Sequence, residues 1–170
     1  MLNTRRSADY PEEYPERLDT LAAARAWAAA DLADEPFAAG VTTLDTDGLA
    51  AARTLRDAIV TAIDHRSGEP ERTAAWAAID EAAGRTPLEL HLGPNGSALR
   101  PAPPVTLAAL LLTALSRVLD EGRWSRIRLC ARDTCRGAFY DTTRNRTQCW
   151  HSYASCGNRS NQAAYRCRAG

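Results

Sequence analysis

The five cysteines of this chain all lie between positions 130 and 167, and none occurs among the first 129 of its 170 residues. Four residues separate Cys130 from Cys135, and Cys149, His151 and Cys156 follow. Thiols and an imidazole at such spacing are typical of a structural zinc site. A set of disulfides is the alternative. Because the charged N-terminus lacks the apolar region of a signal peptide, we expect a cytoplasmic protein, in which disulfides are rare.

The charges of the chain are segregated, although they sum to zero. Residues 1–122 carry 11 Arg against 19 Asp and Glu, whereas residues 123–170 carry 10 Arg against Asp133 and Asp141 alone. This asymmetry suggests a basic module for a polyanion, joined to an acidic body. Composition changes to Arg, Cys and aromatic residues just after Gly122, so we predict an N-terminal domain over 1–122 and a C-terminal module over 123–170.

The hydrophobic pattern predicts a mainly α-helical N-terminal domain. Gly84 is expected to end the third of its helices and Gly122 the fourth. The fourth is apolar nearly all round, which makes it the predicted centre of the core. Apolar residues recur at helical spacing in four segments: 17–32, 47–63, 71–83 and 105–120.

Strands are predicted in both parts of the chain. Alternating leucines precede a Pro94-Asn95-Gly96 turn, which predicts a small β-hairpin over residues 88–99. In the C-terminal module, residues 126–129 and 138–140 have the pattern of two short strands. Asn158 is expected to cap a final helix that runs to Arg168. The module is therefore predicted to be a small zinc-binding α+β unit.

One set of residues in this module follows a known pattern: Cys130-x4-Cys135, Phe139-x-Asp141, Arg144-Asn145-Arg146, Trp150, Cys156-Gly157-Asn158-Arg159 and Tyr165. Over residues 128–168 the chain resembles the CGNR zinc-finger family. Members of that family usually carry a helical domain called ABATE ahead of the finger and are described as stress-induced transcription regulators. The segment Leu55-Arg56-Asp57-Ala58-Ile59 is similar to the Leu-Arg-Glu-Ala helix of that domain.

The chain departs from the family pattern at one zinc ligand. The family usually has Trp-Cys with the cysteine five residues before the CGNR cysteine, whereas this chain has Trp150-His151 there. The register therefore puts His151 in the ligand position, and imidazole is a competent zinc ligand, with Cys149 as the alternative. Four protein ligands leave no open coordination position, so the one zinc ion is expected to be structural. The predicted ligands are Cys130, Cys135, His151 and Cys156.

Five arginines of the module are predicted to contact nucleic acid: Arg144, Arg146, Arg159, Arg166 and Arg168. The first two precede the third ligand, and the other three lie on the predicted final helix, so guanidinium groups could face phosphates or guanine edges. The alternative is structural. Three thiolates and one imidazole give a zinc site a net charge of −1, which nearby arginines would neutralise, and Arg159 is the first candidate for that role.

These features favour a DNA-binding transcription regulator. One finger covers only about three base pairs, so specific binding is expected to need a homodimer. The helical domain would dimerise or bind a small-molecule or protein partner. A protein-interaction module or an RNA-binding module is the alternative. We expect no enzyme, because no catalytic motif is found, and no membrane protein, because the longest apolar stretch is too short to span a bilayer.

Overall fold

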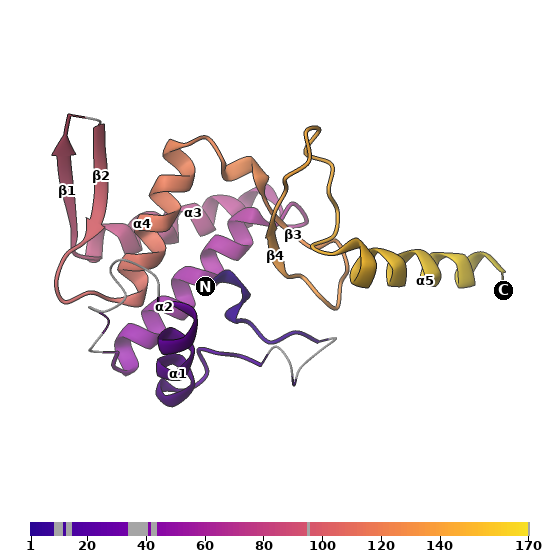
Figure 1. Cartoon of the computed structure of the whole chain (residues 1–170), viewed down its shortest axis with the longest axis horizontal. Helices are drawn as coiled ribbons and strands as arrows, with labels where there is room; N and C mark the ends of the chain where they lie inside the picture. Colours follow the sequence, from indigo (N-terminus) through magenta and orange to yellow (C-terminus); the bar gives the residue numbers. More distant parts are fainter. Residues whose placement is uncertain (9–11, 13–14, 34–40, 42–43, 95, 170) are drawn as a thin grey trace.

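Helices form most of the N-terminal domain (Figure 1). The computed structural model describes residues 1–8, 12, 15–33, 41, 44–94 and 96–169, with side chains up to residue 163. The predicted fold class, a mainly helical domain followed by a small α+β module, is confirmed. Within the described residues the domain contains α1 (Leu21–Asp31), α2 (Thr46–Ile63), α3 (Glu69–Arg85) and α4 (Leu107–Asp120).

The main core lies where α2, α3 and α4 meet. Leu55, Ile59 and Ile63 form one stripe along α2 and are almost fully buried, together with Ile79 of α3 and Leu112 of α4. Burial of each such side chain contributes about 1.5–3 kcal/mol to folding. A second cluster joins α1 to the first half of α2. The helix α4 contributes to both clusters, which explains its nearly continuous apolar sequence.

Several helix boundaries differ by one to four residues from the predicted ones. Oγ1 of Thr20 accepts a hydrogen bond from the backbone N–H of Ala23 at 3.1 Å, so α1 begins at Leu21 and not at residue 17. Gly84 does not end the third helix, because α3 continues to Arg85. One glycine in a helix costs only about 1 kcal/mol, which the packing of α3 on α2 can offset.

The predicted hairpin is present and projects from the body. Strand β1 (Leu88–Gly93) pairs antiparallel with β2 (Gly96–Pro101), and Leu90 lies opposite Leu99. Its second strand extends two residues beyond the predicted end. Strand β2 contacts α4. The hairpin lies at the opposite end of the molecule from the C-terminal helix (Figure 1).

The C-terminal module begins with two short strands. After a 3-10 turn, β3 (Ile127–Leu129) pairs antiparallel with β4 (Ala138–Tyr140), as expected from the sequence. A single π-helical turn, Tyr153–Gly157, then leads directly into α5 (Asn158–Ala169), which extends away from the body (Figure 1).

The start of this last helical segment corrects one prediction. Asn158 was expected to cap the helix, but it already has helical backbone angles. Oγ of Ser152 caps the segment instead, because it accepts a hydrogen bond from the backbone N–H of Ser155 at 3.3 Å. The helical path therefore begins at Tyr153, before Cys156, and the cysteine sits inside a turn of fixed shape.

The module is docked on the helical body. Trp124, Ile127 and Leu129 pack against the cluster formed by α2, α3 and α4. The rings of Trp124 and Trp76 of α3 have centroids 5.0 Å apart at a 58° tilt. Several of the apolar residues that the sequence assigns to the module therefore pack against the core of the body.

Polar contacts also join the two parts. Arg136, in the loop after β3, forms an ion pair with Asp64 at the end of α2. The N-terminal segment reaches the module as well: Oδ1 of Asn3 accepts from the N–H of Ala138 at 2.7 Å, and Nδ2 of Asn3 donates to the carbonyl of Ala138 at 2.9 Å. Residues before α1 thus contact β4 of the module.

Candidate metal centre

The loop between β3 and β4 holds two of the cysteines. Cys130 directly follows β3 and is fully buried, and its N–H donates to the carbonyl of Gly137 at 2.8 Å. The N–H of Cys135 donates to the carbonyl of Arg132 at 3.1 Å, which closes a tight turn. The backbone N–H of Gly137 in turn donates to Sγ of Cys135 at 3.4 Å. This loop directs the sulfur atoms of Cys130 and Cys135 to one place, and Sγ of Cys135 accepts a hydrogen bond from the backbone.

The other half of the site comes from the start of the last helical segment. His151 precedes the Ser152 cap, and Cys156 lies in the π-helical turn, where it is buried. Gly157 follows because a larger residue would not fit. A Cβ there would lie 2.8 Å from a ring atom of Tyr153 and 3.2 Å from one of Trp150. The glycine lets the two aromatic rings pack beside the turn.

The structure brings Cys130, Cys135, His151 and Cys156 together. Their candidate ligand atoms all lie within 4.8 Å of one another. Nδ1 of His151 is 3.3 Å from Sγ of Cys135 and 3.6 Å from Sγ of Cys156. In a tetrahedral zinc site the nitrogen and sulfur ligands lie about 3.6 Å apart, because zinc–nitrogen and zinc–sulfur bonds are about 2.1 and 2.3 Å long. The two distances from His151 are therefore close to those expected between ligands of one zinc ion.

Cys149 lies apart from this cluster. Its side chain is exposed, and its Sγ contacts the carbonyl of Thr147 at 3.4 Å. It is not among the four residues whose ligand atoms converge. The backbone of Cys149 does serve the module, since its carbonyl accepts from the N–H of Ala131 at 2.8 Å. This bond ties the segment before His151 to the loop that carries the first two cysteines.

The electrostatics of the cluster fit a divalent cation. Burial raises the pKa of the Cys135 thiol to about 12, and the neighbouring Cys130 and Cys156 add to the shift. Burial also raises the pKa of Cys156. Ionised thiols packed this closely repel one another, so the set as it stands favours the neutral form. A zinc ion would reverse that preference, since it binds thiolates and compensates their charge.

A buried carboxylate shapes the loop over residues 142–148. Asp141 is fully buried, and it accepts hydrogen bonds from the N–H and hydroxyl of Thr143 and from the N–H of Gln148. Arg128 of β3 also donates to it, at 3.4 Å. Burial alone would raise the pKa of Asp141, but these hydrogen bonds, led by those of Thr143, outweigh it and lower the pKa. The loop is therefore held at both ends by one ionised side chain.

This loop presents the first two predicted nucleic-acid contacts. Arg144 is exposed at its tip. Arg146 is also exposed, but its Nη1 donates to the hydroxyl of Ser125 at 2.9 Å, and its carbonyl accepts from Arg128 at 2.6 Å. Its backbone has φ of 53°, in the left-handed region. Arg146 thus has a structural role in the loop, whereas no contact of the Arg144 side chain is found among the described residues.

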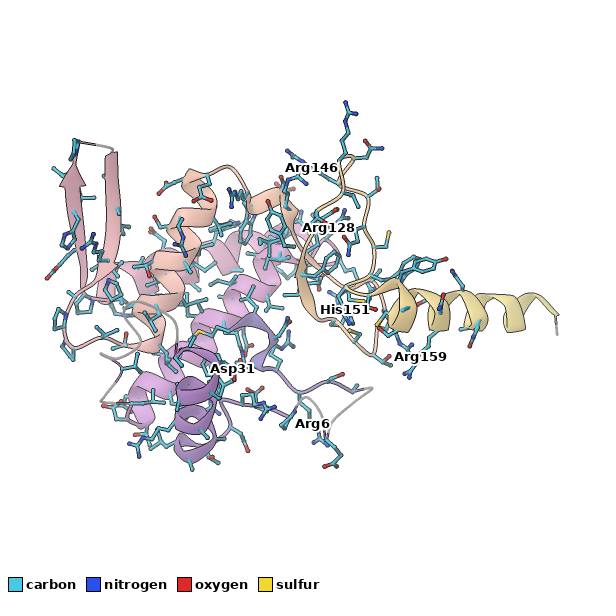
Figure 2. The ribbon with its side chains drawn as sticks, viewed as in Figure 1. Arg6, Asp31, Arg128, Arg146, His151 and Arg159 are labelled. Atoms are coloured by element: carbon cyan, nitrogen blue, oxygen red, sulfur yellow. The ribbon has the colours of Figure 1, made fainter. Side chains whose placement is uncertain are left out.

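The arginines of the last helix lie elsewhere. Arg159 is exposed in the first turn of α5, and Arg146 and Arg159 lie on opposite sides of His151 (Figure 2). The two do not form one patch in this arrangement. The backbones of Arg166 and Arg168 lie on α5, as predicted, but their side chains fall outside the described residues.

Sequence reasoning did not assign roles to Asp141, Arg126 or Arg128. Nη1 of Arg126 donates to the carbonyls of Asp141 and Thr143, at 2.9 and 3.0 Å. One signal was available, because Asp141 is one of only two acidic residues in a module with ten arginines. A carboxylate among so many arginines is expected to pair with one of them. The burial of Asp141, however, depends on how the 142–148 loop folds back.

Comparison with models of known families finds two matches. The ABATE family, whose description is "Putative stress-induced transcription regulator", matches residues 1–122, and the CGNR zinc finger matches residues 126–169. The search of curated proteins finds no match. None of the described helices is long and apolar enough to cross a membrane. Because the first match covers well over half of the chain, the chain belongs to the ABATE family and carries a CGNR zinc finger after its ABATE domain.

Proposed function

We propose that this chain is a DNA-binding transcription regulator whose finger is folded around one structural zinc ion. Cys130, Cys135, His151 and Cys156 would hold the ion as three thiolates and one imidazole. All four positions of a tetrahedral site would then be filled, so the metal would offer no open position for catalysis, and we propose no enzymatic role. The convergence of the four ligand atoms supports this assignment.

The observation that carries the DNA-binding proposal is the loop over residues 142–148. Buried Asp141, Arg126 of the 3-10 turn and Arg128 of β3 hold it in a defined shape. Arg144 stands exposed at its tip. Because the loop is already ordered, a phosphate contact by Arg144 would cost little extra backbone entropy. The two acidic residues of the module do not oppose this charge, since Asp141 is buried and Asp133 pairs with Arg66 of the body.

We propose a smaller part for the other arginines. Arg146 already bonds Ser125, so it would contribute a charge near the phosphates while it supports the loop. Arg159 lies on the other side of the zinc ligand His151 (Figure 2), so it would reach DNA only through a separate contact or would balance the charge of the zinc site. Arg166 and Arg168 remain predictions, as possible contacts along α5.

The proposal is tested by fluorescence anisotropy of labelled duplex DNA, titrated with zinc-loaded full-length protein at several salt concentrations. Binding should weaken with salt and vanish when a chelator removes zinc. Arg144→Gln should weaken binding and reduce the salt slope by about one phosphate contact. Arg117→Gln, on α4 of the acidic domain, is the matched control and should bind as the wild type does. No binding of duplex DNA at low salt would refute the proposal.

A second candidate is a binder of single-stranded RNA. It is favoured by Tyr153, which is 63% exposed beside the ring of Trp150, and by the exposed ring of Tyr140. Bases can stack on such rings with little dependence on sequence. In a competition between duplex DNA and unpaired RNA, preference for RNA together with a large loss in Tyr153→Ala would favour this second function over the first.

The body would supply the regulatory part of the function. We propose that the ABATE domain responds to a small-molecule or protein partner and brings two fingers together in a homodimer, since a single finger contacts few base pairs. Such a regulator would act in the cytoplasm, where its thiols stay reduced and able to bind zinc. The docking of the module on α2 and α3 supports a coupling between the two parts.

A further inference from the structure

The β1–β2 hairpin exposes an apolar face to solvent. Leu90 is 62% exposed, Leu92 is 79% exposed and Leu99 is 38% exposed. Alternate residues of a strand share one face, and Leu90 lies opposite Leu99, so the three side chains form one patch. A two-stranded hairpin is at best marginally stable without a further strand or a covering layer. Strand β2 has such a layer in α4, whereas Leu90 and Leu92 of β1 stay exposed, so β1 is open to a further strand in a larger sheet.

The outer edge of β1 carries the backbone groups that such a sheet would use. The N–H of Ala102 donates to the carbonyl of Pro87 at 3.1 Å, which extends the β1–β2 ladder by one pair. Hydrogen-bonded and non-bonded pairs alternate in an antiparallel ladder. Within the described residues β1 pairs with β2 alone. The N–H and C=O groups that face outward therefore belong to Leu88, Leu90 and Leu92.

We propose that this edge pairs antiparallel with the β1 edge of a second copy of the chain. The strand sequence Leu88-Glu89-Leu90-His91-Leu92 has the same pattern in both directions about its centre. A two-fold axis at Leu90 puts that leucine opposite its own counterpart and puts Leu88 opposite Leu92 of the second copy. The same register puts Glu89 opposite His91 of the second copy, a complementary pair of charges when the imidazole is protonated.

The register agrees with the backbone as well as with the side chains. The central residue of the new ladder is Leu90, whose N–H and C=O face outward, so the two copies can exchange both hydrogen bonds at the axis. The result is a four-stranded antiparallel sheet in the order β2-β1-β1-β2. Its leucines share one face, where cross-strand leucine pairs cover part of the surface that each hairpin exposes alone. A partner of another sequence would lack this self-complementarity.

The position of the hairpin suits such a dimer. It lies at the end of the molecule opposite α5 (Figure 1), so pairing through β1 leaves the CGNR finger of each copy accessible. Pairing through β1 would give the proposed homodimer a surface and a register, and it does not require that the finger bind DNA. Failure of the DNA-binding experiment and failure of this one are therefore separate results.

The dimer is tested by sedimentation equilibrium of the zinc-loaded full chain, from low micromolar to submillimolar concentration. The wild type should sediment as a dimer that dissociates on dilution. Leu90→Arg puts two like charges opposite each other at the axis and should raise the dissociation constant at least about tenfold. Arg100→Ser, on β2, which would be the outer strand of the four-stranded sheet, and on the polar face, is the control and should leave the dimer intact.

The register needs its own variants. Oε2 of Glu89 lies 3.3 Å from Nε2 of His91 in the same strand, so both groups lie on the polar face of β1 that the second copy would extend. Glu89→Arg should weaken the dimer several-fold, and addition of His91→Glu to the same chain should restore it. Helical circular dichroism and zinc content report that each variant folds. If Leu90→Arg fails that check, Leu90→Thr takes its place, because a β-branched residue suits a strand.

Three results would overturn the proposal. A wild type that stays monomeric at every concentration excludes the dimer. A dimer that Leu90→Arg and Leu90→Thr do not weaken has its interface elsewhere. A dimer that Leu90→Arg breaks but that Glu89→Arg leaves unchanged does not have the strand register described, since that register puts Glu89 against His91.

Discussion

Nδ1 of His151 lies 3.3 Å from Sγ of Cys135, so the imidazole presents this nitrogen to the thiol cluster. The nearby thiol of Cys149 contacts the carbonyl of Thr147 instead. Two candidate ligands that stand two residues apart in the sequence therefore have different surroundings in the fold. The difference arises because His151 directly precedes the Ser152 cap and faces the β3–β4 loop. Cys149 is exposed and belongs to the segment before His151.

The first prediction concerns zinc affinity. His151→Ala removes one of the four proposed ligands and should weaken zinc binding at least about tenfold. Loss of a residue that only hydrogen-bonds a ligand already weakens metal binding by about this factor, so loss of a ligand should cost at least as much. His151→Cys should restore tight binding of one zinc, because a fourth thiolate can fill the same position. The measurement is a competition titration against a chromophoric chelator.

The control for this experiment is Cys149→Ser. It should keep one tightly bound zinc per chain, since the Cys149 thiol lies apart from the cluster. If Cys149→Ser loses the metal while His151→Ala keeps it, the proposed ligand set is wrong and the loop must rearrange when zinc binds.

The composition of the site was predictable from the sequence, but its architecture was not. The spacing of Cys130, Cys135 and Cys156, together with the family register at Trp150, singled out the residues that converge in the structure. The sequence has no comparable signal for Asp141 as the centre of a hydrogen-bond network. That role needs Arg128 of β3 and the 142–148 loop to meet, and spacing along the chain does not contain this information.

The fold shows the same division between local and long-range features. Periodicity predicted the helices and the hairpin, since these depend on residues a few positions apart. The change of composition after Gly122 placed Trp124 in the C-terminal module, and the ring of Trp124 packs on Trp76 of the body. A contact between residues so far apart in sequence depends on how the domain leaves one face of α3 open, so only the assembled structure reveals it.

The second prediction is that zinc removal reaches the helical body. Ala138 of β4 exchanges two hydrogen bonds with Asn3, and Trp124 packs on Trp76, so a loosened finger should loosen its neighbours. A chelator should increase hydrogen exchange in residues 1–8 and in α3 as well as in the finger, while α1 changes little. Exchange confined to residues 126–169 would contradict this coupling.

The third prediction concerns the carboxylate that holds the arginine loop. Asp141→Asn removes the charge that accepts from Arg128 and from two backbone N–H groups. The loop should become more mobile, the melting temperature should fall, and DNA affinity should fall with it even though no arginine has changed. Asp133→Asn is the matched control, because Asp133 is exposed and pairs with Arg66 outside the loop. An Asp141→Asn protein with wild-type exchange in residues 142–148 would contradict the assignment.

The fourth prediction is a pH dependence. Burial raises the pKa of Asp64, but the hydrogen bond from Arg136 and the other contacts outweigh it, so the pKa lies below its ordinary value of 3.8. A lowered pKa contributes stability that is complete above the unfolded-state pKa and is lost as the pH falls through the folded-state pKa. Asp64→Asn should therefore destabilise the protein by about 1 kcal/mol, equally at all values between about pH 5 and 8. Urea unfolding measures the difference, and a difference that shrinks between pH 8 and pH 5 would count against the ion pair.

The last prediction concerns a buried cation in the body. Arg56 of α2 is 3% exposed and bonds Glu16 and Thr4 of the N-terminal segment and Asp57 of its own helix. Burial lowers the pKa of Arg56, but the hydrogen bonds from its guanidinium to Glu16 and Asp57 outweigh burial and raise it, so the charge is retained. Removal of one partner of a buried pair costs about 3–5 kcal/mol.

Arg56→Ala should therefore lower the free energy of unfolding by about 3 kcal/mol or more and release the N-terminal segment from α2. Arg56→Met is the matched variant. It keeps the apolar stem that packs on α2, and Glu16, which is partly exposed, can turn to water, so the loss should be smaller. Zinc content should stay at one per chain in both variants, because Arg56 contacts no residue of the finger in the described structure. Equal losses in the two variants would mean that Arg56 acts through its charge and hydrogen bonds alone and that the packing volume of its stem contributes little.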